Sequence, residues 1–263
     1  MRGTIIKDDN RYGYTEEYLK KRGVSFDVYE NSDLDIIIFP FKGEPDQSIY
    51  KNSYFASLKK EVHIFSGLRN EYLSKKCKEY GLSYYVMLEA PSVQINNAIP
   101  TSEGVIEYII TNRTNTIHNS RILIIGYGVC GSDLAKRLKV LGADVYALVR
   151  NKEKESLAFS DSITPIYLNE LSCTGKLRAF DVIVNTVPTR IFTNEMTSLT
   201  GDTLLIDIAS SPYGFDIELA KKNNEKSAIL PAIPSKYAIK TAGEILGAYI
   251  FDIVTKGKGT SKC

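Results

Sequence analysis

The stretch RILIIGYGVCGSDLAKRLKVLGADVYALVRN, residues 121–151, decides the fold of this chain. It opens with an apolar run, passes through a glycine loop, continues with Leu134, Leu138 and Leu141, and ends in a second apolar run over 144–149. The leucines recur at the spacing of one helix face, and the apolar runs have the length of buried strands. The stretch therefore predicts a strand, a helix and a parallel strand, the unit from which α/β sheets are built.

The glycines of the loop are spaced as G-x-G-x-x-G. The first glycine allows a tight turn, the second lets the backbone approach a pyrophosphate, and the third permits close packing of helix on strand. Because the motif follows a strand and opens a helix, it predicts dinucleotide binding; a purely structural turn is the alternative. The residues assigned to the cofactor are Gly126, Tyr127, Gly128, Val129, Cys130 and Gly131.

Arg150 stands at the end of the second apolar run. In NAD-binding folds an acidic residue about 20 positions beyond the glycines accepts hydrogen bonds from the ribose hydroxyls, whereas an arginine pairs with the 2′-phosphate of NADP. Arg150 therefore favours NADP as the cofactor, with NAD as the other possibility. The alternative is that Arg150 and Lys152 are solvated loop charges.

Strand-like and helical patterns alternate along the chain, which is typical of α/β folds with parallel sheets. In the first third, helical patterns at 15–22 and 70–80 fall among strands expected over 3–6, 24–29, 35–39, 61–65 and 83–88. In the second half, strands are expected over 121–125, 144–149, 181–185, 203–208 and 227–230.

Two further helices are expected to connect the domains. Apolar residues at 105, 106, 109 and 110 recur at helical spacing behind Thr101 and Glu103, which predicts a bridging helix that begins there. The amphipathic pattern at 241–256 is expected to pack back on the first domain. We expect an N-terminal domain over 1–98, a bridging helix and linker over 99–117, a dinucleotide-binding Rossmann domain over 118–236, and a return helix and tail over 237–263.

The composition limits the class of protein and of site. The 263 residues are 43% hydrophobic and 24% charged with a net charge of +2, which predicts a globular protein without the basic surface of a general nucleic-acid binder. We expect a cytoplasmic protein, because no apolar run reaches the roughly 20 residues of a membrane span and no signal peptide is evident. Cys77, Cys130, Cys173 and Cys263 form no CxxC pair, which predicts free thiols and no metal site, with Cys130 as a packing residue.

The two histidines, His63 and His118, are both expected to be structural. His63 lies inside an apolar strand and His118 just before the strand that leads into the glycine loop. A dehydrogenase acting on a 2-hydroxy acid usually needs a histidine at the carbonyl oxygen. The sequence therefore favours an oxidation that needs no strong base, such as the aromatisation of a dihydropyridine.

Several segments occur in an order and spacing that resemble the A-subunit family of dipicolinate synthase. They are IFSGLRNEYL at 64–73, the run from INNAIP at 95–100 to GADV at 142–145, DVIVNTVP at 181–188, LLIDIASSPYGFD at 204–216 and AILPAIPSKYAIKTAGEIL at 228–246. The resemblance implies a two-domain α/β protein, with a flavodoxin-like N-terminal domain and a doubly wound Rossmann domain akin to those of 2-hydroxyacid dehydrogenases.

The same resemblance implies NAD(P)-dependent oxidation of a dihydrodipicolinate-level precursor to pyridine-2,6-dicarboxylate, the calcium chelator of bacterial spores. The partner would be the second, flavoprotein-like subunit of dipicolinate synthase, and the compartment the mother cell of a spore former. We also expect a homo-oligomer. The alternatives are another NADP-dependent oxidoreductase of a small cyclic imine or keto acid, a nucleotide-binding partner without catalysis, and a diverged protein that has kept only the fold.

The chain departs from the family's pattern in three places. KDD at 7–9 replaces the glycines of an IGGDxR-type turn, although Arg11 still matches its arginine. Tyr213 stands where the family tends to have glycine. Ser235 and Ile239 replace a glycine and a proline. These changes would retune the substrate or mark a diverged paralogue.

Ligands bind at the carboxyl ends of strands in open α/β sheets, which places further residues at the site. Two strand ends, NTVP and DIAS, are predicted to lie beside the dinucleotide, although Asn185 and Thr186 could instead cap a turn. These cofactor-side residues are Asn185, Thr186, Val187, Pro188, Asp207, Ala209 and Ser210.

A dianionic substrate needs cationic or amide donors, and we expect it in a cleft between the domains. The residues assigned to it are Ser66, Gly67, Arg69, Thr101 and Arg190, where each charge could instead be a solvated surface group.

The candidate catalytic residues are Glu103, Lys236 and Thr241. Glu103 would remove a ring proton, unless its carboxylate only stabilises a helix N-terminus. Lys236 would hold a substrate carboxylate or be a surface charge. Thr241 would orient the amide of the cofactor or cap the last helix.

Overall fold

The computed structural model describes residues 1–27, 33–42, 51–172, 176–191, 193, 196, 202–223 and 226–256. The chain forms two compact units, one from Met1–Asn97 with Ala238–Cys263 and one from Ala98–Tyr237. Cys173, Cys263 and the end of the strand predicted over 24–29 lie outside the described residues. Cys77 and Cys130 are free cysteines, as predicted. No helix in the described part of the chain has both the length and the apolarity needed to cross a membrane.

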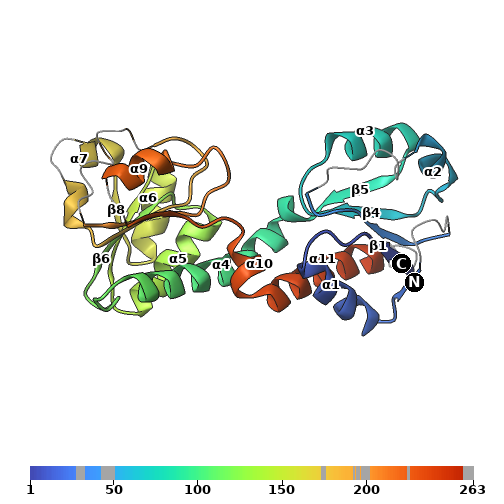
Figure 1. Ribbon diagram of the computed structural model, residues 1–263, viewed down its shortest axis with the longest axis horizontal. Helices are drawn as coiled ribbons and strands as arrows, with labels where there is room; N and C mark the ends of the chain where they lie inside the picture. Colours follow the sequence, from blue (N-terminus) through green and yellow to red (C-terminus); the bar gives the residue numbers. More distant parts are fainter. Residues whose placement is uncertain are drawn as a thin grey trace. The chain divides into compact units, whose positions relative to one another are not determined.

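The first unit contains a parallel sheet of five strands in the order β2-β1-β3-β4-β5, of which Figure 1 labels β1, β4 and β5. The strands are β1 (Arg2–Ile5), β2 (Ser25–Phe26), β3 (Ile36–Ile38), β4 (His63–Ser66) and β5 (Ser83–Val86). The central strand β3 is buried along its whole length, which its three consecutive isoleucines allow. The five strands predicted for this region are confirmed; β2, β3 and β5 are shorter than predicted, and β1 and β4 are shifted by one or two residues.

The helices of the first unit are α1 (Arg11–Lys20), α2 (Asn52–Ser57), α3 (Glu71–Tyr80), the 3-10 turn η1 (Met87–Glu89) and α11 (Ile239–Lys256). The last helix packs on α1, as predicted (Figure 1). Thr15 Oγ1 donates to the carbonyl oxygen of Gly243 at 2.9 Å. A Cβ on Gly243 would lie 2.4 Å from the carbonyl oxygen of Arg11, so only glycine lets the two helices approach this closely.

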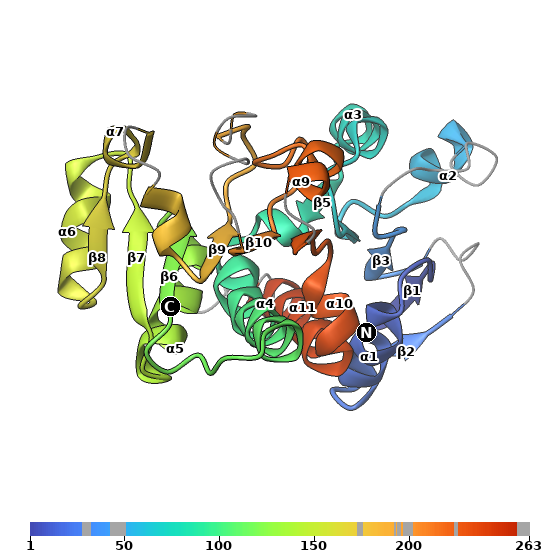
Figure 2. The same cartoon turned by 60° about the vertical axis from the view of Figure 1, so that its left-hand side comes forward.

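The second unit is a parallel six-stranded sheet in the order β11-β10-β9-β6-β7-β8, which Figure 2 shows from β8 to β10. The strands are β6 (Arg121–Ile125), β7 (Asp144–Leu148), β8 (Thr164–Ile166), β9 (Val182–Asn185), β10 (Leu204–Asp207) and β11 (Ser227–Ile229). Helices of the unit are α5 (Val129–Val140), α6 (Lys152–Ser160), α7 (Leu168–Ser172), η2 (Lys176–Ala179), α9 (Ile217–Asn223) and α10 (Ile233–Tyr237). The order is that of the Rossmann fold, with β6 as the first strand.

Five of these six strands match the prediction, and β8 was missed. It has three residues, contains Pro165, and pairs only with β7 at the edge of the sheet. An edge strand tolerates proline because one side of it needs no ladder hydrogen bonds. Its pattern is therefore too short and too irregular to stand out in the sequence.

The helix α4 (Pro91–Asn112) differs from the prediction. It runs through Pro100, so the expectation that a helix begins at Thr101 is wrong, and Thr101 and Glu103 lie inside it. Proline removes one helix hydrogen bond, but α4 buries Val93 in one core and Val105 in another. Burial on both sides of the proline keeps the helix continuous.

Candidate dinucleotide-binding site

The glycine loop between β6 and α5 has a geometry that side chains would destroy. Gly126 has φ of +92°, and a Cβ there would lie 2.4 Å from Val187 Cγ2. A Cβ on Gly131 would lie 2.1 Å from the carbonyl oxygen of Gly126. In contrast, a Cβ on Gly128 would meet no atom within 4 Å. Two glycines are thus required by the chain itself, and the third leaves an open side against which a ligand can lie.

A pocket of about 370 Å³ opens at this loop, at the carboxyl ends of β6, β7 and β9. Its walls are largely apolar, and two basic side chains stand among them. The lining residues are Ile125, Gly126, Tyr127, Gly128, Leu148, Val149, Arg150, Lys154, Leu168, Thr186, Val187, Pro188 and Ile191. An apolar pocket with a few charged groups at a helix N-terminus suits a ligand that joins flat rings to phosphates.

Arg150 and Lys152 differ in their surroundings. Arg150 lines the pocket and, among the described residues, forms no ion pair. Lys152 lies outside the pocket, where its Nζ is 2.7 Å from Glu155 Oε2. Lys152 therefore fits the interpretation as a solvated loop charge, whereas Arg150, although exposed, lies at the pocket.

The sequence interpretation missed Lys154, which also lines the pocket. Asn151 caps α6, and its Oδ1 accepts from the backbone amide of Lys154 at 3.0 Å. This cap fixes Lys154 in the first turn of the helix, shortly after Arg150. The signal in the sequence is an Asn followed three positions later by a lysine, at a helix start next to the predicted 2′-phosphate position.

The other residues of the glycine loop contribute in different ways. Tyr127 lines the pocket, but its hydroxyl donates to Asp161 Oδ2 at 2.7 Å. Burial raises the pKa of Tyr127, and the bond to Asp161 raises it further. Val129 and Cys130 do not line the pocket. Burial, with a smaller effect of Asp133, raises the pKa of the Cys130 thiol, so this cysteine is a neutral packing residue rather than a thiolate.

Asn185 and Asp207 were predicted beside the dinucleotide, but neither lines the pocket. Both are fully buried. Asn185 Nδ2 donates to Asp207 Oδ1 and to the carbonyl oxygen of Val187, each at 3.0 Å. Asp207 also accepts from the amides of Ala209 at 2.9 Å and Gly214 at 2.6 Å. Burial raises the pKa of Asp207, and these hydrogen bonds oppose the rise.

These bonds hold the two loops that follow β9 and β10. Thr186, Val187 and Pro188 line the pocket, and Thr186 Oγ1 donates to the carbonyl oxygen of Ile125 at 2.9 Å. Ala209 is buried and Ser210 is exposed, and neither lines the pocket. The sequence thus identified the loops, while the side chains of Asn185 and Asp207 shape them from within.

Tyr213 lies in the loop after β10 with φ of +62°, in the left-handed region. This region favours glycine, and the family tends to have glycine at this position. The next residue, Gly214, has no room for a side chain, because its Cβ would lie 2.4 Å from Asn185 Nδ2. The substitution at 213 therefore strains a loop that the buried Asn185–Asp207 pair fixes in place.

The residues of the first unit that were predicted to bind substrate are in contact with other residues of the chain. Ser66 is buried, and its hydroxyl donates to the carbonyl oxygen of Leu68 at 2.6 Å. A Cβ on Gly67 would lie 2.5 Å from the ring of Phe41. Arg69 is paired with Glu89 through two of its nitrogens, with Nε 2.9 Å from Oε1. This salt bridge raises the pKa of Arg69 and lowers that of Glu89.

The acidic side chains of the loop after β1 are likewise bonded to other residues of the chain. Asp8 Oδ1 accepts from the amide of Phe41 at 2.6 Å. Arg11 is 6% exposed and donates to both oxygens of Asp9 at 2.8 Å, with its guanidinium 3.7 Å from the centroid of the Phe41 ring. Burial alone would raise the pKa of Asp9, but the hydrogen bonds and charge of Arg11 lower it.

The remaining site predictions are scattered. Glu103 is exposed on α4, 3.7 Å from Arg137 Nη1 of α5. Arg190 is 3.6 Å from Asp216 Oδ2. Lys236 is exposed on α10, Thr241 is exposed on α11, and Thr101 is half-buried in α4. None of these predicted residues lines the pocket, and neither does His63 or His118.

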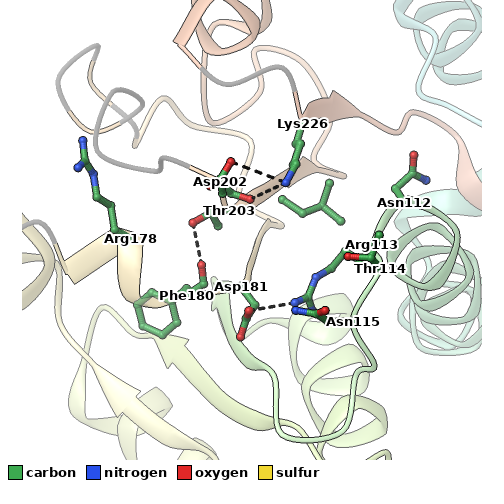
Figure 3. A pocket seen from close by; sticks show the side chains of 11 residues that line it. Asn112, Arg113, Thr114, Asn115, Arg178, Phe180, Asp181, Asp202, Thr203 and Lys226 are labelled. Atoms are coloured by element: carbon green, nitrogen blue, oxygen red, sulfur yellow. Dashed lines mark hydrogen bonds and ion pairs between the residues drawn. The ribbon is translucent and has the colours of Figure 1, made fainter.

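A second cavity, of about 520 Å³, lies at the opposite edge of the same sheet, where β9, β10 and β11 begin (Figure 3). Arg113 donates to Asp181 Oδ1 at 2.9 Å, and Lys226 Nζ lies 3.8 Å from Asp202 Oδ1. Opposite charges of the chain thus neutralise two of its three basic side chains, Arg178 being the third. Since the glycine loop is at the other edge, the smaller pocket is the candidate site.

Comparisons with known proteins agree with this site. Residues 102–202 match the family described as D-isomer specific 2-hydroxyacid dehydrogenase, NAD binding domain. The chain is 33% identical over 184 residues to the A-subunit of dipicolinate synthase from Bacillus subtilis (strain 168), an alignment that covers 70% of this chain but only 61% of that relative. The second unit is therefore an NAD-binding domain, which supports a nicotinamide dinucleotide as cofactor and an oxidoreductase as the class of protein.

Solved structures show the same fold. The A chain of dipicolinate synthase from Bacillus subtilis has a TM-score of 0.88 at 24% identity, covering 98% of this chain and 97% of that one. The corresponding protein from Bacillus halodurans has a TM-score of 0.85 at 24% identity, covering 96% and 97%. The apo-structure of D-lactate dehydrogenase from Escherichia coli has a TM-score of 0.66 at 12% identity, covering 98% of both chains.

Proposed function

We propose that the chain is a member of the A-subunit family of dipicolinate synthase, and that it is an NADP-dependent oxidoreductase that converts a dihydrodipicolinate-level precursor to pyridine-2,6-dicarboxylate. The observation that carries this proposal is the pocket at the glycine loop, with Arg150 in its lining. A nicotinamide dinucleotide bound there would supply the acceptor for two electrons and one of the two hydrogens that leave the ring.

The residues of this pocket fit such a group. The amides at the N-terminus of α5 would hold the pyrophosphate, since Gly128 leaves their side open. Arg150 would hold the 2′-phosphate of NADP, because it has no carboxylate partner among the described residues. The Thr186 hydroxyl, bonded to the carbonyl of Ile125, would keep the loop after β9 at the correct distance from the ligand.

The residues proposed to act on the substrate are those that the sequence predicts. Glu103 is the candidate for the ring proton, Lys236 for a substrate carboxylate and Thr241 for the orientation of the cofactor amide. Aromatisation favours loss of the ring proton, so a weak base is sufficient. Ser66, Gly67, Arg69, Thr101 and Arg190 remain candidates for binding the substrate.

A second candidate function is oxidation of another small cyclic imine or keto acid with NADP. It is favoured by the state of the cations proposed to bind a dicarboxylate, since Arg69 pairs with Glu89 and Arg190 with Asp216. Arg11, which matches the arginine of the family's opening motif, is likewise held by Asp9. A substrate with fewer negative charges would need fewer free cations.

Further parts of the proposal concern organisation. The first unit is proposed to be flavodoxin-like, which its strand order 2-1-3-4-5 supports. The second, flavoprotein-like subunit of the synthase is proposed as the partner. The relatives are named as the A-subunit of dipicolinate synthase, which implies a further subunit. A homo-oligomer in the cytoplasm, in the mother cell of a spore former, is proposed with it.

The test uses a precursor labelled with deuterium at the hydrogen that leaves as hydride, with the purified chain, NADP⁺ and the second subunit. The expected result is label in the reduced nicotinamide and turnover that depends on this chain. Oxidation without label in the nicotinamide contradicts the proposal, because the electrons then reach another acceptor. Turnover of a cyclic imine or keto acid by this chain alone favours the second candidate, and nucleotide binding without any turnover leaves a non-catalytic partner.

A further inference from the structure

We propose that Lys154 is a second determinant of the NADP preference, and that Lys154 and Arg150 together bind the 2′-phosphate of the adenosine half. This inference rests on the proposed function, because it concerns the same pocket. Its first support is position: Arg150 and Lys154 both line the pocket, and the Asn151 cap between them fixes the helix start from which Lys154 extends. Two cations this close in the chain suit a group with two negative charges.

The charges around these two cations support the same conclusion. The acidic residues beside them in the sequence are Glu153 and Glu155, and neither lines the pocket. Glu155 is held by Lys152 at 2.7 Å and by the hydroxyl of Tyr167 at 3.0 Å. Glu153 is 73% exposed and lies 3.3 Å from Lys154 Nζ. The Lys154 side chain is half-buried, but because Glu153 is largely exposed to water the pair is weak, so a phosphate in the pocket competes well for Lys154.

A ribose with a free 2′-hydroxyl finds no matching carboxylate there. An NAD site needs a carboxylate at the end of the second strand to accept from the ribose hydroxyls. After β7 the chain instead has Val149, Arg150 and Asn151, and the Asn151 side chain is committed to the cap. The pocket therefore discriminates between the cofactors through two attractive charges and through the lack of this acceptor.

The apolar wall of the pocket indicates where the adenine would lie. Leu168 lines the pocket at the start of α7 and is 47% exposed, which leaves much of its aliphatic surface in contact with water. Pro188 and Ile191 line the same pocket from the loop after β9. A flat adenine ring placed among them would cover Leu168, and the adjacent ribose would then carry its 2′-phosphate toward the two cations.

The experiment measures binding of adenosine 2′,5′-bisphosphate and of 5′-AMP to the full chain by calorimetry. These probes represent the adenosine half with and without the 2′-phosphate, so no catalytic step is involved. The variants are Lys154→Ala, Arg150→Ala, Lys154→Arg and, as the matched control, Lys152→Ala. The control removes the same charge from the same helical turn, outside the pocket.

We expect Lys154→Ala to weaken binding of the bisphosphate about tenfold and Arg150→Ala to weaken it more, with binding of 5′-AMP changed less than about twofold. Lys154→Arg should restore most of the affinity, and Lys152→Ala should match the native chain. Equal affinities of Lys154→Ala and Lys152→Ala for the bisphosphate would overturn the inference. The proposed cofactor site would still stand in that case if the native chain binds NADP⁺. A native chain that binds neither NADP⁺ nor NAD⁺ overturns the proposed function and the inference with it.

Discussion

The carboxyl edges of the two parallel sheets have opposite characters. In the second unit the loop after β6 is built of glycines, Gly128 faces open space, and Arg150 has no ion-pair partner among the described residues. In the first unit the loop after β1 is acidic, with Asp8 bonded to the amide of Phe41 and Asp9 to the buried Arg11. In the second unit the hydrogen-bond donors at the carboxyl ends of the strands remain available to a ligand. In the first unit such donors are bonded to carboxylates of the chain.

A shared fold therefore does not fix what an edge can bind. Both edges have the strand ends and helix starts at which α/β sheets take ligands. Availability is decided by a few side chains, because a donor that already has a charged partner gains little from a ligand. Single substitutions should be able to close the open edge or to open the closed one.

The largest effect is expected from Gly131→Ala, which closes the open edge. Its Cβ would lie 2.1 Å from the carbonyl oxygen of Gly126, so helix and loop must separate. We expect a loss of about 3 kcal/mol or more in the free energy of unfolding and loss of NADP⁺ binding, measured by chemical denaturation and calorimetry. The control is Gly128→Ala, whose Cβ meets no atom within 4 Å; it should stay within about 1 kcal/mol of the native stability and weaken only the binding. Equal losses of stability in the two variants would show that Gly131 has no greater steric need for glycine than Gly128.

A smaller effect is expected from Asp9→Asn, which opens the closed edge. The substitution leaves the buried Arg11 without its charged partner. The Asp9 side chain is 19% exposed, so water reduces the cost of losing the pair. We expect a loss of about 1–2 kcal/mol in the free energy of unfolding at neutral pH, measured by chemical denaturation.

The pH dependence of this loss has a defined sign. The folded-state pKa of Asp9 is lowered, so its contribution is present above the ordinary value of 3.8 and is lost as the pH falls through the folded-state pKa. Denaturation curves of the native chain and Asp9→Asn should therefore converge on acidification. A difference that stays constant below pH 3.8 would contradict the ion pair as its cause.

Asp8→Ala changes the same edge more mildly. It removes the acceptor of the Phe41 amide, which lies 2.6 Å from Asp8 Oδ1. The bond is only part-buried and Asp8 is exposed, so water can partly replace the lost oxygen. We expect a loss of about 1 kcal/mol in the free energy of unfolding, again from denaturation curves. Asp8→Asn, which keeps an acceptor oxygen, should lose less than Asp8→Ala. No difference between the two variants would mean that the hydrogen bond contributes nothing.

The smallest effect is expected from Tyr213→Gly at the open edge. Glycine relieves the left-handed φ of +62° but makes the unfolded chain more flexible, so the net gain should be about 0.5–1 kcal/mol. Tyr213→Ala keeps a Cβ and should show no such gain. Thermal unfolding of the three proteins measures this; a gain in the alanine variant would assign the effect to the tyrosine ring instead.

The sequence predicts features that depend on short local patterns. The apolar run 121–125, the glycine spacing and the leucines of α5 each specify one element, and their order specifies the unit. Arg150 could be found because strand end and motif together fix its place. β8 could not be found, since a three-residue edge strand with Pro165 has no periodicity to detect.

Other features depend on contacts between distant segments. The sequence places a helix start at Thr101, directly after Pro100, but burial of Val93 and Val105 on either side of the proline keeps α4 continuous. Asn185 and Asp207 look like ligand-facing polar groups, yet they bond to each other across neighbouring strands. The partners that occupy Arg69 and Arg11 are likewise visible only once the strand ends have been brought together.

The packing of α11 on α1 bears on the synthesis of the protein. The first unit takes its segments from both ends of the chain, and Thr15 donates to the carbonyl of Gly243, 228 residues later. The second unit is continuous in sequence, from Ala98 to Tyr237. As a chain leaves the ribosome from its N-terminus, the nucleotide-binding unit can complete its core while the first unit still lacks its last helix. The core of the second unit can thus be complete before that of the first, although the first unit begins earlier in the sequence.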